Sequence, residues 1–90
     1  MTNFRPAPGV QWVVEEDGIV LIHAGAGSLR LTGVSAALWA LVMSGRGRVK
    51  VQKMLAAISG ETPETTAATM ERLFVLWKEK GYLARRYPDG

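Results

Sequence analysis

Few side chains in this sequence could carry out catalysis, and their spacing does not suit it. His23 is the only imidazole, and the absence of cysteine excludes thiol nucleophiles, disulfides and cysteine-bound metal. Glu15, Glu16 and Asp17 are consecutive, whereas an acid–base pair needs carboxylates on opposite sides of a cleft. The hydroxyl residues, such as Ser35, form no nucleophile motif. We therefore expect no enzyme activity, metal or cofactor, and for His23 either a structural role or no special role.

Phosphate-binding chemistry is also poorly supported. Ala24-Gly25-Ala26-Gly27 is rich in glycine, but it lacks the Lys-Ser/Thr of a P-loop and the full dinucleotide-binding fingerprint. We interpret this segment as a flexible connection between two strands.

Positive charge is concentrated in the middle of the chain. Eleven Lys and Arg against eight Asp and Glu give a net charge of +3, too small to identify a nucleic-acid-binding protein. No acidic residue occurs between Gly18 and Gly60, where the basic residues are Arg30, Arg46, Arg48, Lys50 and Lys53. Their positive potential could attract an acidic ligand, or they could form a solvated basic face.

The length of the chain allows one domain. Ninety residues cannot support two cores, and 48% hydrophobic residues suffice for one. No apolar run reaches the roughly 20 residues of a membrane span, and the first residues lack a signal-peptide core, so we expect a cytoplasmic protein with no membrane contact. We divide the chain into a mobile lead-in over residues 1–9, a domain over residues 10–84 and a polar tail over residues 85–90.

A β-hairpin is predicted near the N-terminus. Val10–Glu16 and Ile19–His23 flank Asp17-Gly18, a pair that suits a type I′ turn. The expected pairing puts on one face Trp12, Val14, Ile19 and Leu21. It puts on the other face Val13, Val20 and Ile22. One face must cover the helices, and the other leaves an apolar patch for self-association or a partner protein.

A third strand is predicted over Ser28–Leu31, because Leu29 and Leu31 alternate with Ser28 and Arg30. In a meander this strand lies at the edge of the sheet. It contains no proline and only one charge, so its edge lacks the usual protection. Its unpaired N–H and C=O groups are therefore open to an incoming peptide.

Three helices are expected after the sheet, which makes the fold α+β. Thr32 can cap a helix over about Val34–Ser44 that is apolar on every side, which predicts a central position. A second helix near Arg48–Ser59 has one apolar face, formed by Val51, Met54, Leu55 and Ile58.

The third and longest helix is predicted to begin with Thr62 as its cap and Pro63 in its first turn, and to run to Lys80. Its core face consists of Met70, Leu73, Phe74 and Trp77. Leu76 lies off this face, on a stripe that could contact a peptide and that also carries Thr69, Arg72, Leu73 and Lys80. Alternatively, Leu76 widens the core face.

The order and spacing of these features resemble the PqqD-like family, the stand-alone form of the peptide recognition element in the biosynthesis of ribosomally made, modified peptides. The resemblance covers Pro8 to about Ala84. It rests on Pro8-Gly9-Val10, Leu29-Arg30-Leu31-Thr32, Ala37-Leu38-Trp39 followed by Ser44-Gly45, and the closing run from Leu73 to Leu83.

This resemblance implies a three-stranded antiparallel sheet followed by three helices, similar to a winged helix-turn-helix, and no catalytic activity. Members of the family bind the leader of a precursor peptide and present it to a radical enzyme, a cyclase or a leader peptidase. In the family the leader adds as a strand beside strand three and lies against helix three. In this chain we expect the acidic groups of a leader to lie near Arg30, Arg72 or Lys80. The implied peptide-binding residues are Ser28, Leu29, Arg30, Leu31, Thr69, Arg72, Leu73, Leu76 and Lys80.

Two other functions remain open. The excess of basic over acidic residues would suit a winged-helix DNA-binding module. In such a module, however, the hairpin usually follows the recognition helix, whereas this hairpin precedes all helices. The last helix also mixes basic with acidic residues, a poor surface for phosphates. The third possibility is a structural module that forms a homodimer through the outer face of the sheet.

Overall fold

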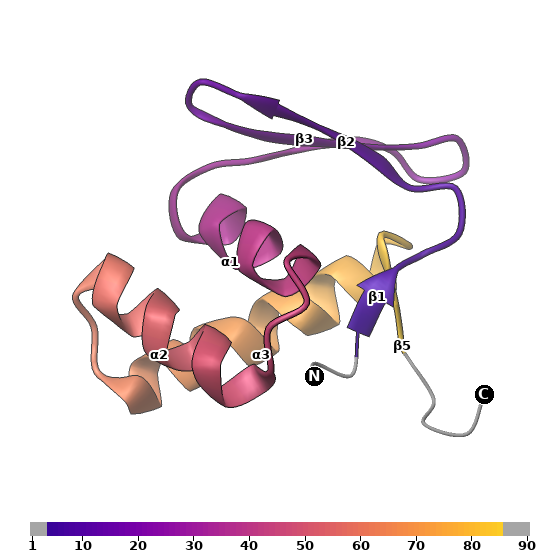
Figure 1. Ribbon diagram of the computed structural model, residues 1–90. Helices are drawn as coiled ribbons and strands as arrows, with labels where there is room; N and C mark the ends of the chain where they lie inside the picture. Colours follow the sequence, from indigo (N-terminus) through magenta and orange to yellow (C-terminus); the bar gives the residue numbers. More distant parts are fainter. Residues whose placement is uncertain (1–3, 86–90) are drawn as a thin grey trace.

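A three-stranded antiparallel sheet and three helices form an α+β fold in the computed structural model, which describes residues 4–85 (Figure 1). The sheet has the order β2 (Gln11–Glu15), β3 (Gly18–His23), β4 (Gly27–Leu31). The helices that follow are α1 (Gly33–Met43), α2 (Arg48–Ser59) and α3 (Pro63–Glu79). The predicted fold class is confirmed, and a second, two-stranded sheet pairs β1 (Phe4–Pro6) with β5 (Leu83–Arg85).

The hairpin of β2 and β3 has the predicted faces and a different turn. Glu15 pairs with Gly18, so the turn consists of Glu16 and Asp17 instead of Asp17 and Gly18. The register is shifted by two residues from the prediction, and because side chains alternate with a period of two, each stays on its predicted face. Gly18 does not have a positive φ. A Cβ there would collide with the carbonyl oxygen of Leu31, so close backbone approach explains this glycine.

The helix α1 lies between the sheet and the other two helices, as its apolar surface predicts (Figure 1). Thr32 is its N-cap residue, and the Thr32 N–H donates to Oγ of Ser35 at 3.2 Å. Trp39 is fully buried and makes edge-to-face contacts with Trp12 and Trp77, at ring distances of 5.6 and 5.3 Å. These three rings join the sheet to α1 and α3.

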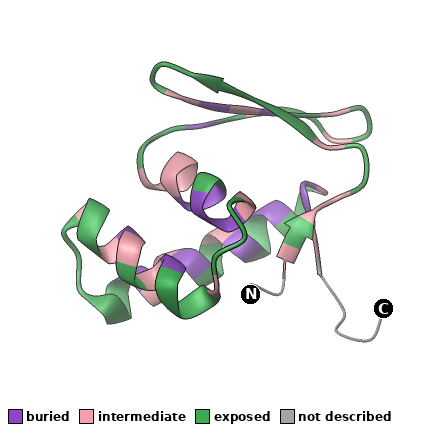
Figure 2. Ribbon diagram, in the orientation of Figure 1, coloured by how far each residue is buried: buried purple, intermediate pink, exposed green. Residues whose placement is uncertain are grey.

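The helices α2 and α3 begin at the residues where the sequence predicts them. Gly47 is the N-cap of α2, and the Thr62 hydroxyl accepts a hydrogen bond from the Thr65 N–H at the start of α3. Figure 2 shows their buried residues on the faces that meet the rest of the molecule. The prediction for Ile58 is wrong: its side chain is exposed, and the buried residues of α2, Val51 and Leu55, lie before its last turn.

The two ends of the described chain meet in the small sheet, which no pattern in the sequence predicts. Residues 4–6 form β1 instead of a mobile lead-in, and the Phe4 ring lies 4.7 Å from that of Phe74. The Ala7 N–H also donates to the carbonyl of Tyr82 at 3.0 Å. A strand of three residues is too short to show a hydrophobic period in the sequence. It can therefore be recognised only from its pairing with β5. The first three residues of the expected lead-in and residues 86–90 of the expected tail lie outside the described part.

No helix within residues 4–85 is both long enough and apolar enough to cross a membrane.

Candidate functional site

The β4 strand forms one edge of the sheet, and the direction of its polar groups follows from one contact. The Leu31 carbonyl oxygen points at Gly18 of β3. Successive residues of a strand direct their N–H and C=O groups to opposite sides, so Leu29 also faces β3. Ser28 and Arg30 therefore direct these groups away from β3, to the open edge.

The C-terminal end of α3 is held beside the turn that leads into β4. The Tyr82 hydroxyl donates to the Ala26 carbonyl at 3.2 Å, and a Cβ on Gly81 would lie 3.7 Å from that of Ala26. Leu29 of β4 and Leu73 of α3 pack against the same core. The two elements that carry the predicted site residues, β4 and α3, thus pack on one core. The sequence did not predict Ala26 and Tyr82 as the link between these two elements.

The nine predicted site residues differ in exposure. Those exposed are Ser28, Arg30, Arg72, Leu76 and Lys80. Those half-buried are Leu29, Thr69 and Leu73. Leu31 is buried and its carbonyl faces β3, so neither its side chain nor that carbonyl is open to a ligand. We assign Leu31 a supporting role in holding β4 on the core.

Arg30 lies on the outer face of the sheet, away from the core side on which α3 packs. It is opposite Val20 in the register, and its guanidinium donates to Glu15 at 2.6 Å and to Asp17 at 2.5 Å. An acidic group of a ligand would have to compete with these two carboxylates. This arrangement makes the Arg30 side chain a poor partner for the acidic groups of a ligand. The backbone N–H and C=O of Arg30 remain available at the edge.

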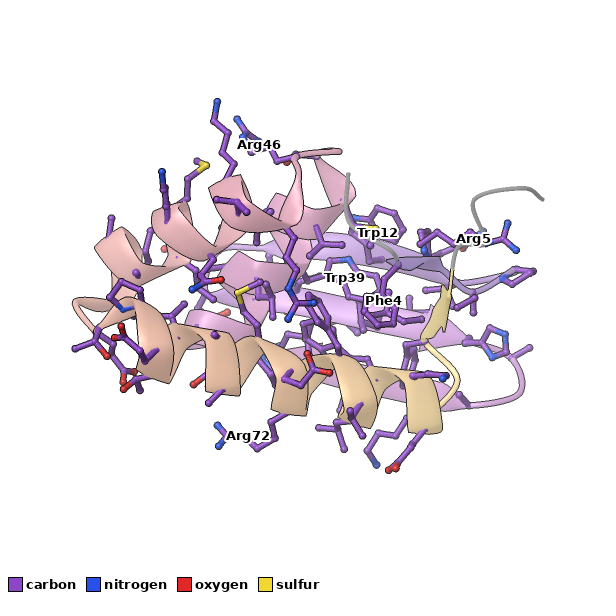
Figure 3. All side chains as sticks on the ribbon, turned by 90° about the horizontal axis from the view of Figure 1, so that it is seen from below. Phe4, Arg5, Trp12, Trp39, Arg46 and Arg72 are labelled. Atoms are coloured by element: carbon purple, nitrogen blue, oxygen red, sulfur yellow. The ribbon has the colours of Figure 1, made fainter. Side chains whose placement is uncertain are left out.

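Arg72 and Lys80 carry the positive charge on the α3 side of the site. Figure 3 shows Arg72 pointing outward, on the side of α3 opposite α2. Within residues 4–85 neither side chain makes an ion pair, whereas Arg48 is paired with Glu71 at 2.9 Å. These two cations are therefore free to meet an acidic partner.

His23 has a structural role, the first of the two alternatives expected for it. Its Nδ1 accepts hydrogen bonds from the N–H groups of Gly25 and Ala26, at 3.2 and 3.1 Å. This assigns the ring proton to Nε2, which donates to the Pro8 carbonyl at 3.2 Å. His23 thus closes the turn between β3 and β4 and ties the N-terminal segment to it. Residues 4–85 contain no cluster of three or more His, Cys, Asp or Glu that could hold a metal ion.

Comparison with known proteins finds similarity in structure only. No protein-family model matches the sequence, and no curated protein matches it. One similar solved structure is TbiB1 in complex with the TbiA(beta) leader peptide, with a TM-score of 0.81 and 19% identity over 88% of this chain and 93% of that chain. Another is lasso peptide synthetase B1 complexed with the leader peptide, with a TM-score of 0.82 and 19% identity over 92% of this chain and 99% of that chain. At this identity the likeness establishes a shared fold.

Proposed function

We propose that this chain is a non-catalytic, PqqD-like protein that binds the leader of a ribosomally made precursor peptide. It holds the peptide in the cytoplasm and presents it to a modifying enzyme, such as a radical enzyme, a cyclase or a leader peptidase. The observation that carries the proposal is the open β4 edge, with the end of α3 beside the turn that leads into it, on a fold shared with two solved leader-peptide complexes. Pairing with a strand edge supplies affinity that depends little on sequence, and neighbouring side chains supply specificity.

In the proposed complex the leader runs antiparallel to β4. Its main chain pairs with the outward N–H and C=O groups of Ser28 and Arg30. Its apolar side chains on the core side of the sheet contact Leu29, Leu73 and Leu76, with Thr69 at the border. Its acidic groups lie near Arg72 and Lys80, where the described residues supply no competing carboxylate.

The modifying enzyme needs a second surface, and the outer face of the sheet is the proposed one. Val13 and Ile22 are exposed there and Val20 is half-buried between them. Since this face is opposite the one that packs on the helices, an enzyme on it would leave the β4 edge free. Peptide and enzyme could then be held at once.

Titration of the ¹⁵N-labelled protein with the leader of a candidate precursor peptide tests the proposal. We expect amide shifts in Ser28–Leu31 and Thr69–Lys80, and none with a scrambled peptide of the same composition. Shifts confined to β2 or α2 would place the site elsewhere. Tight, strongly salt-dependent binding of duplex DNA, with no response to leader peptides, would favour the DNA-binding alternative instead.

A further inference from the structure

The β2 strand forms the second edge of the sheet, and its side chains are more exposed than those of β4. All five of its residues are exposed, and the three central ones are apolar: Trp12, Val13 and Val14. The strand contains no proline or lysine, and its pairing with β3 is regular, without a bulge. Natural proteins use these devices to prevent pairing between edges. Their absence indicates that this edge has a partner.

The outward groups of β2 can be identified from the register. Ile19 pairs with Leu31 and so directs its main-chain groups at β4. The next residue, Val20, therefore directs its groups at β2, where it pairs with Val13. It follows that Trp12 and Val14 direct their N–H and C=O groups to the open edge.

We propose that β2 pairs antiparallel with β2 of a second copy of this chain, about a two-fold axis at Val13. This register places Val13 opposite its own equivalent, Trp12 opposite Val14 and Gln11 opposite Glu15. Every pair is favourable: an aromatic ring meets a β-branched side chain, an amide meets a carboxylate, and no like charges face each other. The outward N–H and C=O groups of Trp12 in one copy also meet those of Val14 in the other. Both copies therefore make the same contacts.

Neighbouring registers are worse. The outward N–H and C=O groups of one copy must meet those of the other, and in β2 these groups belong to Trp12 and Val14. The two-fold axis therefore passes through a residue, and the alternatives to Val13 are Trp12 and Val14. An axis at Val14 would place Val13 opposite Glu15 and Trp12 opposite Glu16. An axis at Trp12 would leave Glu15 opposite Gly9, outside the strand. Only the register at Val13 uses all five residues of β2.

The resulting six-stranded sheet carries β4 at both of its outer ends. The proposed peptide site of each copy therefore stays open, and this inference does not depend on the proposed function. The helices of both copies lie on the same side of the sheet, because Trp12 and Val14 are on the core face of each copy.

The absence of cysteine from the sequence makes single-cysteine crosslinking a direct test. Directly opposite residues in a non-hydrogen-bonded pair have Cα atoms about 4.5 Å apart, within the range of a disulfide. Val13→Cys should therefore form a disulfide-linked dimer on mild oxidation. Val14→Cys on the same strand faces Trp12 instead of its own equivalent, and Val49→Cys is an exposed position on α2, so both should crosslink far less. Equal crosslinking of the three variants, or none by Val13→Cys, would overturn the proposal.

A second variant tests the main-chain pairing. Val14→Pro removes an outward N–H and leaves the hydrogen bonds to β3 in place, so circular dichroism should be unchanged and sedimentation equilibrium should show a shift from dimer to monomer. A wild-type protein that stays monomeric at high concentration would overturn the proposal. So would a dimer that Val14→Pro leaves intact, or β2 amides that gain protection only when a leader peptide or an enzyme is added.

Discussion

Leu76 and Trp77 are adjacent in the chain and have opposite environments. Trp77 is 1% exposed and packs edge-on against Trp39 and Phe74, whereas Leu76 is 39% exposed. One residue turns a helix by 100°, which is enough to move a side chain from the core to the outer stripe of α3. The exposed Leu76 thus offers apolar surface that a ligand could cover without repacking the core.

The Leu76→Asp variant should lose leader binding and keep its fold. A charge in an apolar contact must be desolvated, so we expect at least a tenfold weaker affinity by calorimetry. The free energy of unfolding, from urea denaturation, should fall by less than about 1 kcal/mol, since the side chain is largely exposed. Trp77→Asp, the matched change in the core, should unfold the protein. If both variants unfold, Leu76 belongs to the core and the proposed contact is wrong.

The Arg72→Glu variant should weaken leader binding by only about 1 kcal/mol, because an exposed ion pair is screened by solvent. The effect should shrink further at high salt. Lys53→Glu makes the same change of charge on α2, away from the site, and serves as the control in the same calorimetric titration. Equal losses in the two variants would show that net charge, and not a contact at α3, attracts the peptide.

Among the elements, β4 is held in place on both of its faces and is open at one edge. Its core face is held by Leu31 and its outer face by Arg30, whose two carboxylate partners come from β2 and the following turn. Pairs at this level of exposure contribute little free energy. Their effect is to hold the guanidinium over the outer face of the sheet, away from α3. The strand therefore offers its backbone at the edge while its one charge is engaged elsewhere.

The Arg30→Pro variant should lower leader affinity by removing an outward N–H from β4. Proline also removes the ion pairs of Arg30, so Arg30→Ala is the matched control that loses only the side chain. We expect Arg30→Ala to bind nearly as well as the wild type. Leu29→Pro should instead destabilise the sheet, because the Leu29 N–H faces β3. Equal affinities of Arg30→Pro and Arg30→Ala would rule out main-chain pairing at this residue.

At the scale of the whole molecule, both ends of the chain brace the site. The Pro8 carbonyl and the Tyr82 hydroxyl each reach the turn between β3 and β4, through His23 and Ala26. The small sheet of β1 and β5 joins the two ends to each other. The position of β4 relative to α3 therefore depends on segments at opposite ends of the described chain.

The outer face of the main sheet is the surface proposed for the modifying enzyme. The double variant Val20→Thr, Ile22→Lys should fold normally and bind the leader like the wild type. Its association with the cognate enzyme, measured by biolayer interferometry, should weaken, because a charge replaces apolar contact area. Unfolding of the double variant would show that these residues are part of the core, and unchanged association would assign the enzyme to another surface.

The sequence by itself determined the features that depend on near neighbours in the chain. The start of α3 follows from Thr62 and Pro63, which act within one helical turn, and the faces of β3 follow from strict alternation. These two predictions need no knowledge of distant segments, which is why they hold. The angle of Leu76 to the core residues of its helix left two alternatives, an outer stripe or a wider core face, and only the structure shows that the side chain is exposed.

Tertiary structure alone decided the features that require contact between distant residues. Phe4 forms a strand only because β5 returns to it, and the Tyr82 hydroxyl bonds to Ala26 across 56 positions. The ion pair of Arg30 with Asp17 likewise depends on how β4 pairs beside the hairpin of β2 and β3. Such contacts leave no period or cap in the sequence, since each side supplies half of an interaction that exists only when the chain has folded.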